Sequence, residues 1–122
     1  NKVLNNNTNK KYDLEERTSK FSELIIDLAK KTPKTPVTIP IIDQLIRSGT
    51  SIGANYFEAN GASSKKDFRN KIYICKKEAR ETQYWLRLLA HACSLVKDDC
   101  RVLWKEVGEL IMIFGKILSN TK

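Results

Sequence analysis

Four polar residues lie beside apolar stretches of the sequence and are the first candidates for chemistry: Asn55, Glu58, Glu78 and Glu81. Helical residues three positions apart are neighbours on one face, so each of the two pairs would share a face. Carboxylates against apolar surface could serve as general acids or bases if their pKa values were raised. Because no nucleophile or cofactor motif accompanies them, the sequence favours a structural hydrogen-bonded network that fixes helix register or a subunit contact.

A second set of candidates carries positive charge along one stretch of the chain. Steps of four and three residues place these side chains on one helical face, which holds no acid: Lys65, Arg69, Tyr73, Lys76, Arg80, Gln83 and Arg87. Such a face could follow a phosphate backbone, with Tyr73 available to stack on a base. The alternative is an ordinary solvated surface. We call this set the basic stripe.

The charge balance of the whole chain agrees with the basic stripe. Its 122 residues include 22 Lys and Arg against 14 Asp and Glu, a formal net charge of +8. An excess of this size favours acidic partners, which are nucleic acid, an anionic membrane surface or an acidic protein. It carries no information about the fold.

Most enzyme classes find no support in the sequence. The chain has no phosphate-binding loop, no GxSxG or HExxH motif and no calcium-binding loop. Its one histidine, His91, has leucines at the neighbouring helical positions, so it lacks the Glu-x-x-His pattern of a di-iron bundle. We therefore expect no enzymatic activity, no metal and no cofactor.

Compartment is indicated by the cysteines and by the lack of long apolar segments. An odd number of cysteines without a CxxC pair is typical of free thiols in a reducing cytosol; they are Cys75, Cys93 and Cys100. No segment approaches the roughly 20 apolar residues of a membrane span, and the N-terminal residues lack the apolar core of a signal peptide. The sequence predicts a cytoplasmic protein that does not enter a membrane.

Four helices would position these residues. Apolar residues recur at three- and four-residue spacing over about 12–31, 39–59, 63–95 and 99–119, and all three prolines fall between the first two segments. Residues 1–11 are Asn-rich and predict a flexible tail. No segment shows the alternation typical of a strand. The prediction is an all-α fold, an antiparallel up-down-up-down four-helix bundle over residues 12–122.

Two glycines lie on the apolar stripe of the second helix, Gly49 and Gly53. A glycine inside a helix costs about 0.8–1 kcal/mol relative to alanine. That cost is understandable where a neighbouring helix or an aromatic ring packs closely against the two glycines. We expect Trp85 or Trp104 to lie over the gap that their missing side chains leave.

The last two helices carry more apolar surface than one buried face requires. A second apolar line follows the third helix, and another follows the fourth; together they comprise Trp85, Leu88, Ala92, Leu95, Trp104, Ile111 and Leu118. Exposed apolar patches usually mark interfaces, so these lines predict a homo-oligomer.

Three segments of the chain resemble a known family. They are Ser51–Ala59 (SIGANYFEA), Ser64–Phe68 (SKKDF) and Lys77–Leu86 (KEARETQYWL). The combination of SIxxNxxE with ExxET resembles the bacterial four-helix bundle proteins that include those encoded in 23S rRNA intervening sequences, often labelled ribosomal-like. It is also similar to the accessory variability protein of diversity-generating retroelements. The resemblance extends over about 17–118, although many members have Glu-Gly where this chain has Glu58-Ala59.

The resemblance implies an up-down bundle that assembles into a ring-like homopentamer without enzymatic activity. Retroelement members look like basic rings that bind a reverse transcriptase and nucleic acid, and the four polar residues named first would correspond to shared structural positions. The sequence therefore predicts a basic oligomeric bundle that binds RNA or a ribonucleoprotein. The alternative is a protein-interaction scaffold whose basic face meets an acidic protein, without direct binding of nucleic acid.

Overall fold

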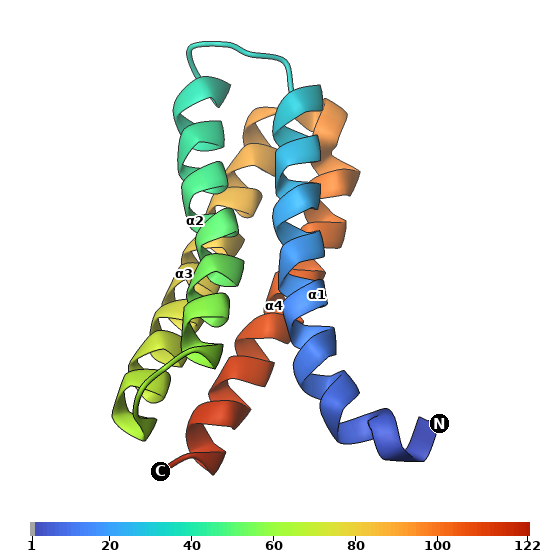
Figure 1. Ribbon diagram of the computed structural model, residues 1–122. Helices are drawn as coiled ribbons and strands as arrows, with labels where there is room; N and C mark the ends of the chain where they lie inside the picture. Colours follow the sequence, from blue (N-terminus) through green and yellow to red (C-terminus); the bar gives the residue numbers. More distant parts are fainter. Residues whose placement is uncertain (1) are drawn as a thin grey trace.

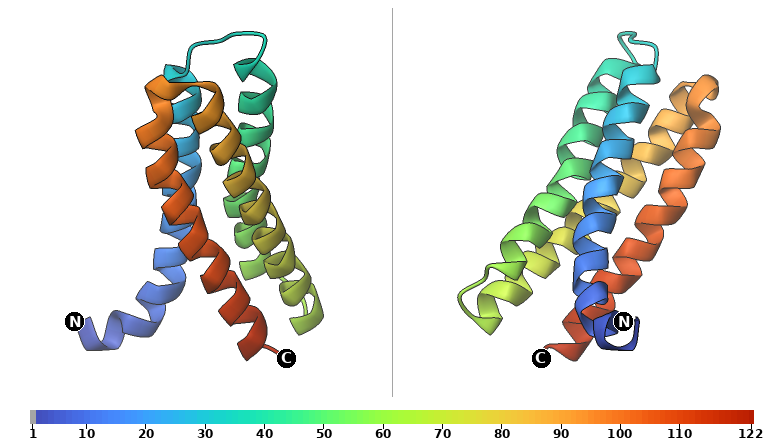
Figure 2. Two further views of the ribbon diagram at one scale, coloured as in Figure 1. Left: turned by 180° about the vertical axis from the view of Figure 1, so that it is seen from behind. Right: turned by 45° about the vertical axis from the view of Figure 1, so that its right-hand side comes forward.

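The computed structural model describes residues 2–122, with side chains from Leu14 onward. Four antiparallel helices form one bundle: α1 (Lys2–Lys31), α2 (Thr38–Asn60), α3 (Lys65–Ala92) and α4 (Lys97–Asn120). A single 3₁₀ turn, η1 (Ser94–Val96), joins α3 to α4. The α1–α2 loop and the α3–α4 junction lie at one end, and the α2–α3 turn and both termini lie at the other (Figures 1 and 2). The described residues contain no strand, so the all-α prediction is confirmed.

The apolar stripes predicted from the sequence meet in the middle of the bundle. The largest fully buried side chains come from all four helices; among them are Phe21, Ile25, Leu45, Ile52, Ile72, Leu86, Leu110 and Phe114. Burying one such side chain contributes roughly 1.5–3 kcal/mol relative to exposure. The core therefore follows directly from the three- and four-residue spacing of apolar residues.

Side-chain caps explain where two of the helices begin. Thr35 and Thr38 cap each other: the Thr38 amide donates to Thr35 Oγ1 at 3.1 Å, and the Thr35 amide donates to Thr38 Oγ1 at 2.9 Å. Ser64 Oγ accepts from the Asp67 amide at 3.0 Å and so caps the start of α3. These bonds satisfy amide groups that have no partner inside the helix.

Two helix ends are closed without such caps. Gly61, which follows α2, has a φ of −101°, so α2 does not end in a left-handed glycine cap. Its amide instead donates to the Glu58 carbonyl, which closes a turn that does not need a positive φ. The fourth helix begins at Lys97 directly after η1, with no side-chain cap at Val96. Asp98 and Asp99 lie in its first turn, where carboxylates suit the helix dipole.

The first helix is longer than predicted. It was expected to begin near Tyr12 after a flexible tail, whereas α1 is helical from Lys2. No glycine or proline interrupts residues 2–32, so the backbone can continue without a break. These first turns point away from the other three helices (Figure 2). The sequence pattern missed them because they bring no apolar stripe to the bundle.

Gly49 and Gly53 face a neighbouring helix, as predicted, but the neighbour is α1 and not a tryptophan. A Cβ built on Gly49 would lie 2.9 Å from Ile25 Cγ1. A Cβ on Gly53 would lie 3.4 Å from the Thr18 carbonyl oxygen, an ordinary contact. The glycines thus let α1 and α2 approach closely, and only the approach at Gly49 excludes a methyl group.

This difference predicts opposite effects for two alanine substitutions. Gly49→Ala should lower the free energy of unfolding by about 1–3 kcal/mol, because Ile25 must shift within a packed core. Gly53→Ala is the matched control and should be neutral or stabilising by up to about 1 kcal/mol, since alanine is the better helix former. Urea denaturation of both variants measures the effect. Equal stability of the two would contradict the close contact.

Candidate functional site

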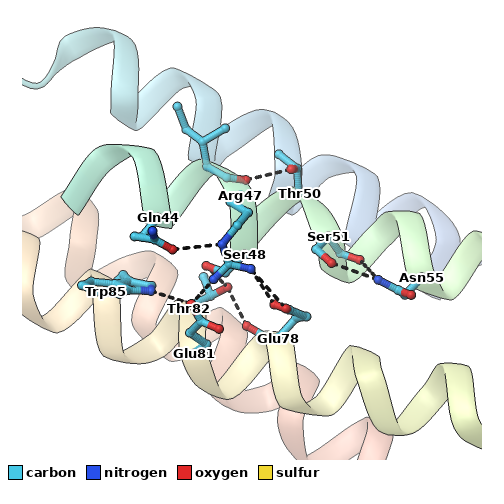
Figure 3. Close-up of polar contacts among 11 residues, drawn as sticks. Gln44, Arg47, Ser48, Thr50, Ser51, Asn55, Glu78, Glu81, Thr82 and Trp85 are labelled. Carbon is cyan, nitrogen blue, oxygen red and sulfur yellow. Dashed lines mark hydrogen bonds and ion pairs between the residues drawn. The ribbon is translucent and has the colours of Figure 1, made fainter. Parts of the chain in front are cut away.

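The two glutamates on α3 form a network with an arginine on α2. Arg47 Nη1 donates to Glu78 Oε1 at 3.1 Å, and Arg47 Nη2 donates to Glu81 Oε2 (Figure 3). Glu81 Oε2 also accepts from Trp85 Nε1 at 2.9 Å. Glu78 is only 7% exposed, so its carboxylate depends on Arg47 for compensation. This arrangement connects α2 to α3.

A buried hydroxyl pair extends the same contact. Thr82 Oγ1 donates to the Glu78 carbonyl at 2.8 Å and forms a hydrogen bond with Ser48 Oγ at 3.0 Å. Both residues are fully buried between the helices. Hydrogen bonds between two helices at one level restrict sliding, so this layer fixes the register of α2 against α3.

Asn55 and Glu58 do not join that network. Asn55 Nδ2 donates to the Ser51 carbonyl and to Ser51 Oγ, both at 2.9 Å and both within α2 (Figure 3). Glu58 is exposed and accepts from Lys71 Nζ at 2.7 Å, and this carboxylate raises the pKa of Lys71. The four residues thus form three separate sets of contacts, each of them satisfied within the bundle.

Sequence reasoning missed two arginines, each of which joins a pair of helices through two glutamates. Arg47, Ser51, Asn55 and Glu58 follow one another at helical spacing on one face of α2. This spacing was the signal from which Arg47 could have been found. Arg17 joins α1 to α4, with Nε 2.7 Å from Glu106 Oε2 and Nη2 2.9 Å from Glu109 Oε1. Glu106, and to a smaller extent Glu109, raise the pKa of Arg17 above its ordinary value. No sequence signal pairs residues so far apart.

The first two residues of the basic stripe contact the end of α4. Arg69 Nη1 donates to the Leu118 carbonyl at 2.6 Å and to Thr121 Oγ1 at 3.2 Å, and Lys65 Nζ donates to the Lys122 carbonyl. Carbonyls at a helix C-terminus lack partners and attract cations. Arg69 therefore has a structural role that the stripe alone did not indicate.

The remainder of the basic stripe faces outward along α3. Tyr73, Arg80 and Arg87 are exposed, and Lys76 is half-buried with its Nζ close to Gly115 of α4. Tyr73, Lys76 and Arg80, together with Lys77, line a shallow hollow of about 280 Å³. The tyrosine ring and three cations thus share one surface.

The ion pairs of the described bundle lie away from the basic stripe and use six of its acids. The six ion pairs among the described side chains use Arg17 twice, Arg47 twice, Lys31 and Lys71. None of them includes a cation of the stripe. The cations of the stripe are thus in no ion pair in the described part of the chain, and the role of this face in binding stays a prediction.

The remaining candidates for chemistry are the three cysteines and the histidine. Cys75, Cys93 and Cys100 are free thiols; burial raises the pKa of Cys75 to about 12 and that of Cys100 to about 11, so both stay protonated. His91 is exposed in the last turn of α3. Among the described residues, no group of three or more His, Cys, Asp and Glu is placed to hold a metal ion. No helix in that part of the chain is long and apolar enough to cross a membrane.

The extra apolar lines divide into buried and exposed members. Trp85, Ile111 and Leu118 pack partly against the core, whereas Leu95 is 79% and Trp104 is 44% exposed. Large apolar side chains that the sequence did not single out are exposed as well, among them Phe57, Val102 and Met112. Apolar surface thus remains on several helices of the bundle.

Comparison with known proteins identifies the family. The family model of the 23S rRNA-intervening sequence protein matches residues 10–116. The chain belongs to this family. The predicted resemblance is therefore confirmed, and the matched residues reach from the N-terminal half of α1 almost to the end of α4.

A solved structure has the same fold. It is a protein of unknown function from the S23 ribosomal protein family of Bacteroides thetaiotaomicron VPI-5482, with 32% identity and a TM-score of 0.76. The match covers 85% of this chain and 96% of that one. No curated protein matches the chain. Membership of the 23S rRNA-intervening sequence family thus establishes the bundle, and the biochemical role has to be argued from the surface.

Proposed function

We propose that this member of the 23S rRNA-intervening sequence family is a non-enzymatic, basic, oligomeric bundle that binds RNA. The observation that carries the proposal is the basic stripe, whose cations take no part in the ion pairs of the described bundle. Arg80 and Arg87 are exposed and make no ion pair there. Cations that are not already paired can displace the counterions of a polyanion, which is the main source of non-specific affinity for nucleic acid.

The aromatic residue on the stripe supports nucleic acid over other polyanions. Tyr73 is 62% exposed and lies beside Lys76, Lys77 and Arg80 around one hollow. An exposed ring among cations can stack on a base while the cations contact phosphates.

The free thiols fit a reducing compartment, so we place the protein in the cytoplasm.

Filter binding at low salt tests the proposal. The unmodified protein should retain several RNAs of unrelated sequence with similar affinity, because phosphate contacts carry no sequence information. A labelled acidic homopolypeptide such as polyglutamate, tested for retention in the same way, represents the alternative of an acidic protein partner. Retention of the polypeptide without retention of RNA would overturn the proposal in favour of the scaffold.

Assembly is the second part of the proposal and rests on the exposed apolar residues. Phe57 is 73%, Leu95 is 79% and Met112 is 75% exposed, on α2, next to α3 and on α4. A second copy of the chain would bury them, and the family resemblance favours a pentameric ring. Repeating the stripe around a ring would let several weak contacts engage one RNA together.

We predict that the protein is larger than its monomer in solution. Light scattering at micromolar concentration should give a multiple of the 14.0 kDa chain mass. Phe57→Ser should lower that mass if the ring buries this side chain, since a polar group would enter an apolar contact. Lys30→Ser, on an exposed position of α1, is the control and should leave the mass unchanged. A particle of 14.0 kDa for the unmodified protein would contradict assembly.

A further inference from the structure

A second hollow, between α3 and α4, combines apolar and basic residues around a tryptophan. Its volume is about 410 Å³, larger than the hollow beside Tyr73. Leu86 and Ala90 contribute apolar surface, and Trp104, 44% exposed, lies on the α4 side. Every charged residue that lines it is a cation: Arg87, Lys97, Arg101 and Lys105. We call this hollow the Trp104 groove.

The charges of α4 are divided between two sides of the helix. Three of its four acids, Asp99, Glu106 and Glu109, pair with Lys31 and Arg17 of α1, whereas Asp98 lies in the first turn and takes part in no ion pair among the described side chains. The cations that line the Trp104 groove take part in none of the ion pairs among the described side chains. The remaining acid, Asp98, does not line the Trp104 groove, so the four cations that line it form a local excess of positive charge that would attract an anionic ligand.

The Trp104 groove is continuous with the basic stripe. Arg87 belongs to both, and Gln83, which lies one turn before it on the stripe, donates to the Trp104 carbonyl at 3.3 Å. A polyanion that follows Arg80 and Arg87 along α3 would therefore reach the groove. There it would meet an aromatic ring and apolar side chains in addition to charge.

We propose that the Trp104 groove binds single-stranded RNA by stacking an unpaired base on the Trp104 indole. This inference rests on the proposed function and names its ligand class. In a duplex the bases are stacked inside the helix and the phosphates of the backbone face outward. A duplex therefore has no free base to place in an apolar hollow. A flexible single strand can turn one base into the hollow, while the four surrounding cations contact the flanking phosphates. The combination of an exposed indole with unpaired cations favours the single strand over an acidic peptide.

Fluorescence anisotropy with two RNAs tests the proposal. One probe is a labelled uridine homopolymer about 15 nucleotides long, and the other is a labelled RNA duplex of equal length. Trp104→Leu keeps the groove apolar and keeps every charge, so it should weaken binding of the homopolymer about tenfold and leave the duplex affinity unchanged. Trp104→Phe keeps a stacking ring and should retain most of the affinity. Tyr84→Leu removes an equally exposed ring outside the groove and should change neither affinity.

The possible results separate this inference from the proposed function. If the unmodified protein binds neither RNA, the proposed function fails and this inference fails with it. If it binds both RNAs but Trp104→Leu leaves the homopolymer affinity unchanged, only the groove inference is overturned. If Trp104→Leu changes the mass of the particle in light scattering, a second copy of the chain covers the groove, which also overturns it. Thermal unfolding of both Trp104 variants shows that they are folded.

Discussion

Replacing Arg80 and Arg87 with glutamate should weaken binding to RNA of any sequence by about tenfold or more at low salt. Both side chains are exposed on the basic stripe and contact no acid among the described residues. Each substitution removes a phosphate contact and adds a repulsive charge, and a ring would repeat both changes in every subunit. The helical fold and the particle mass should not change, because neither side chain is buried.

The control keeps the change in net charge and moves it to another helix. Lys20→Glu with Lys30→Glu changes two exposed positions of α1 and should leave most of the affinity. Arg69 is unsuitable for this test because it holds the end of α4 through Leu118 and Thr121. If the two double variants bind RNA equally, the stripe has no special role and only the net charge matters.

Replacing Arg47 with methionine should lower the free energy of unfolding by about 1–3 kcal/mol. The substitution leaves the carboxylate of Glu78, 7% exposed, without its cation. The cost is smaller than for a fully buried pair because the Arg47 side chain is itself 49% exposed. Replacing Glu78 with methionine as well should recover much of the loss, since an apolar pair needs no compensation.

Lys71→Met is the matched control for Arg47→Met. It also removes a cation that joins α3 to a glutamate of α2, but its partner Glu58 is 56% exposed, so water replaces the lost contact. Urea denaturation of the unmodified protein and the variants gives the comparison. Equal stability of the Arg47→Met and Lys71→Met variants would show that the α2–α3 network does not depend on Arg47.

The sequence predicts the fold well because the bundle is determined by local periodicity. Phe21, Ile52, Ile72 and Phe114 all lie on stripes that helical spacing alone identifies, and all are buried. The Ser64 cap is equally local, because donor and acceptor lie three residues apart. Local rules failed in one region of the backbone, the first turns of α1, where no apolar pattern marks the helix.

Contacts between distant segments are what the sequence could not supply. Gly49 was expected beneath a tryptophan and packs against Ile25, because a glycine predicts a close approach without naming the neighbour. Arg69 belongs to the predicted stripe, yet its bond to the Leu118 carbonyl depends on where α4 ends in space. Lys97, Arg101 and Lys105 of the Trp104 groove share one face of α4 at four-residue spacing, but Arg87 comes from α3 and meets them only in the fold.

The salt dependence of RNA binding by the unmodified protein is the most direct test of the central claim, that the basic face binds the phosphate backbone. Plotting the logarithm of the association constant against the logarithm of the salt concentration gives a slope of about −0.7 per phosphate contact on single strands and about −0.9 on duplexes. The account predicts a slope steeper than about −2, because at least three cations should act together. A slope near zero would contradict it.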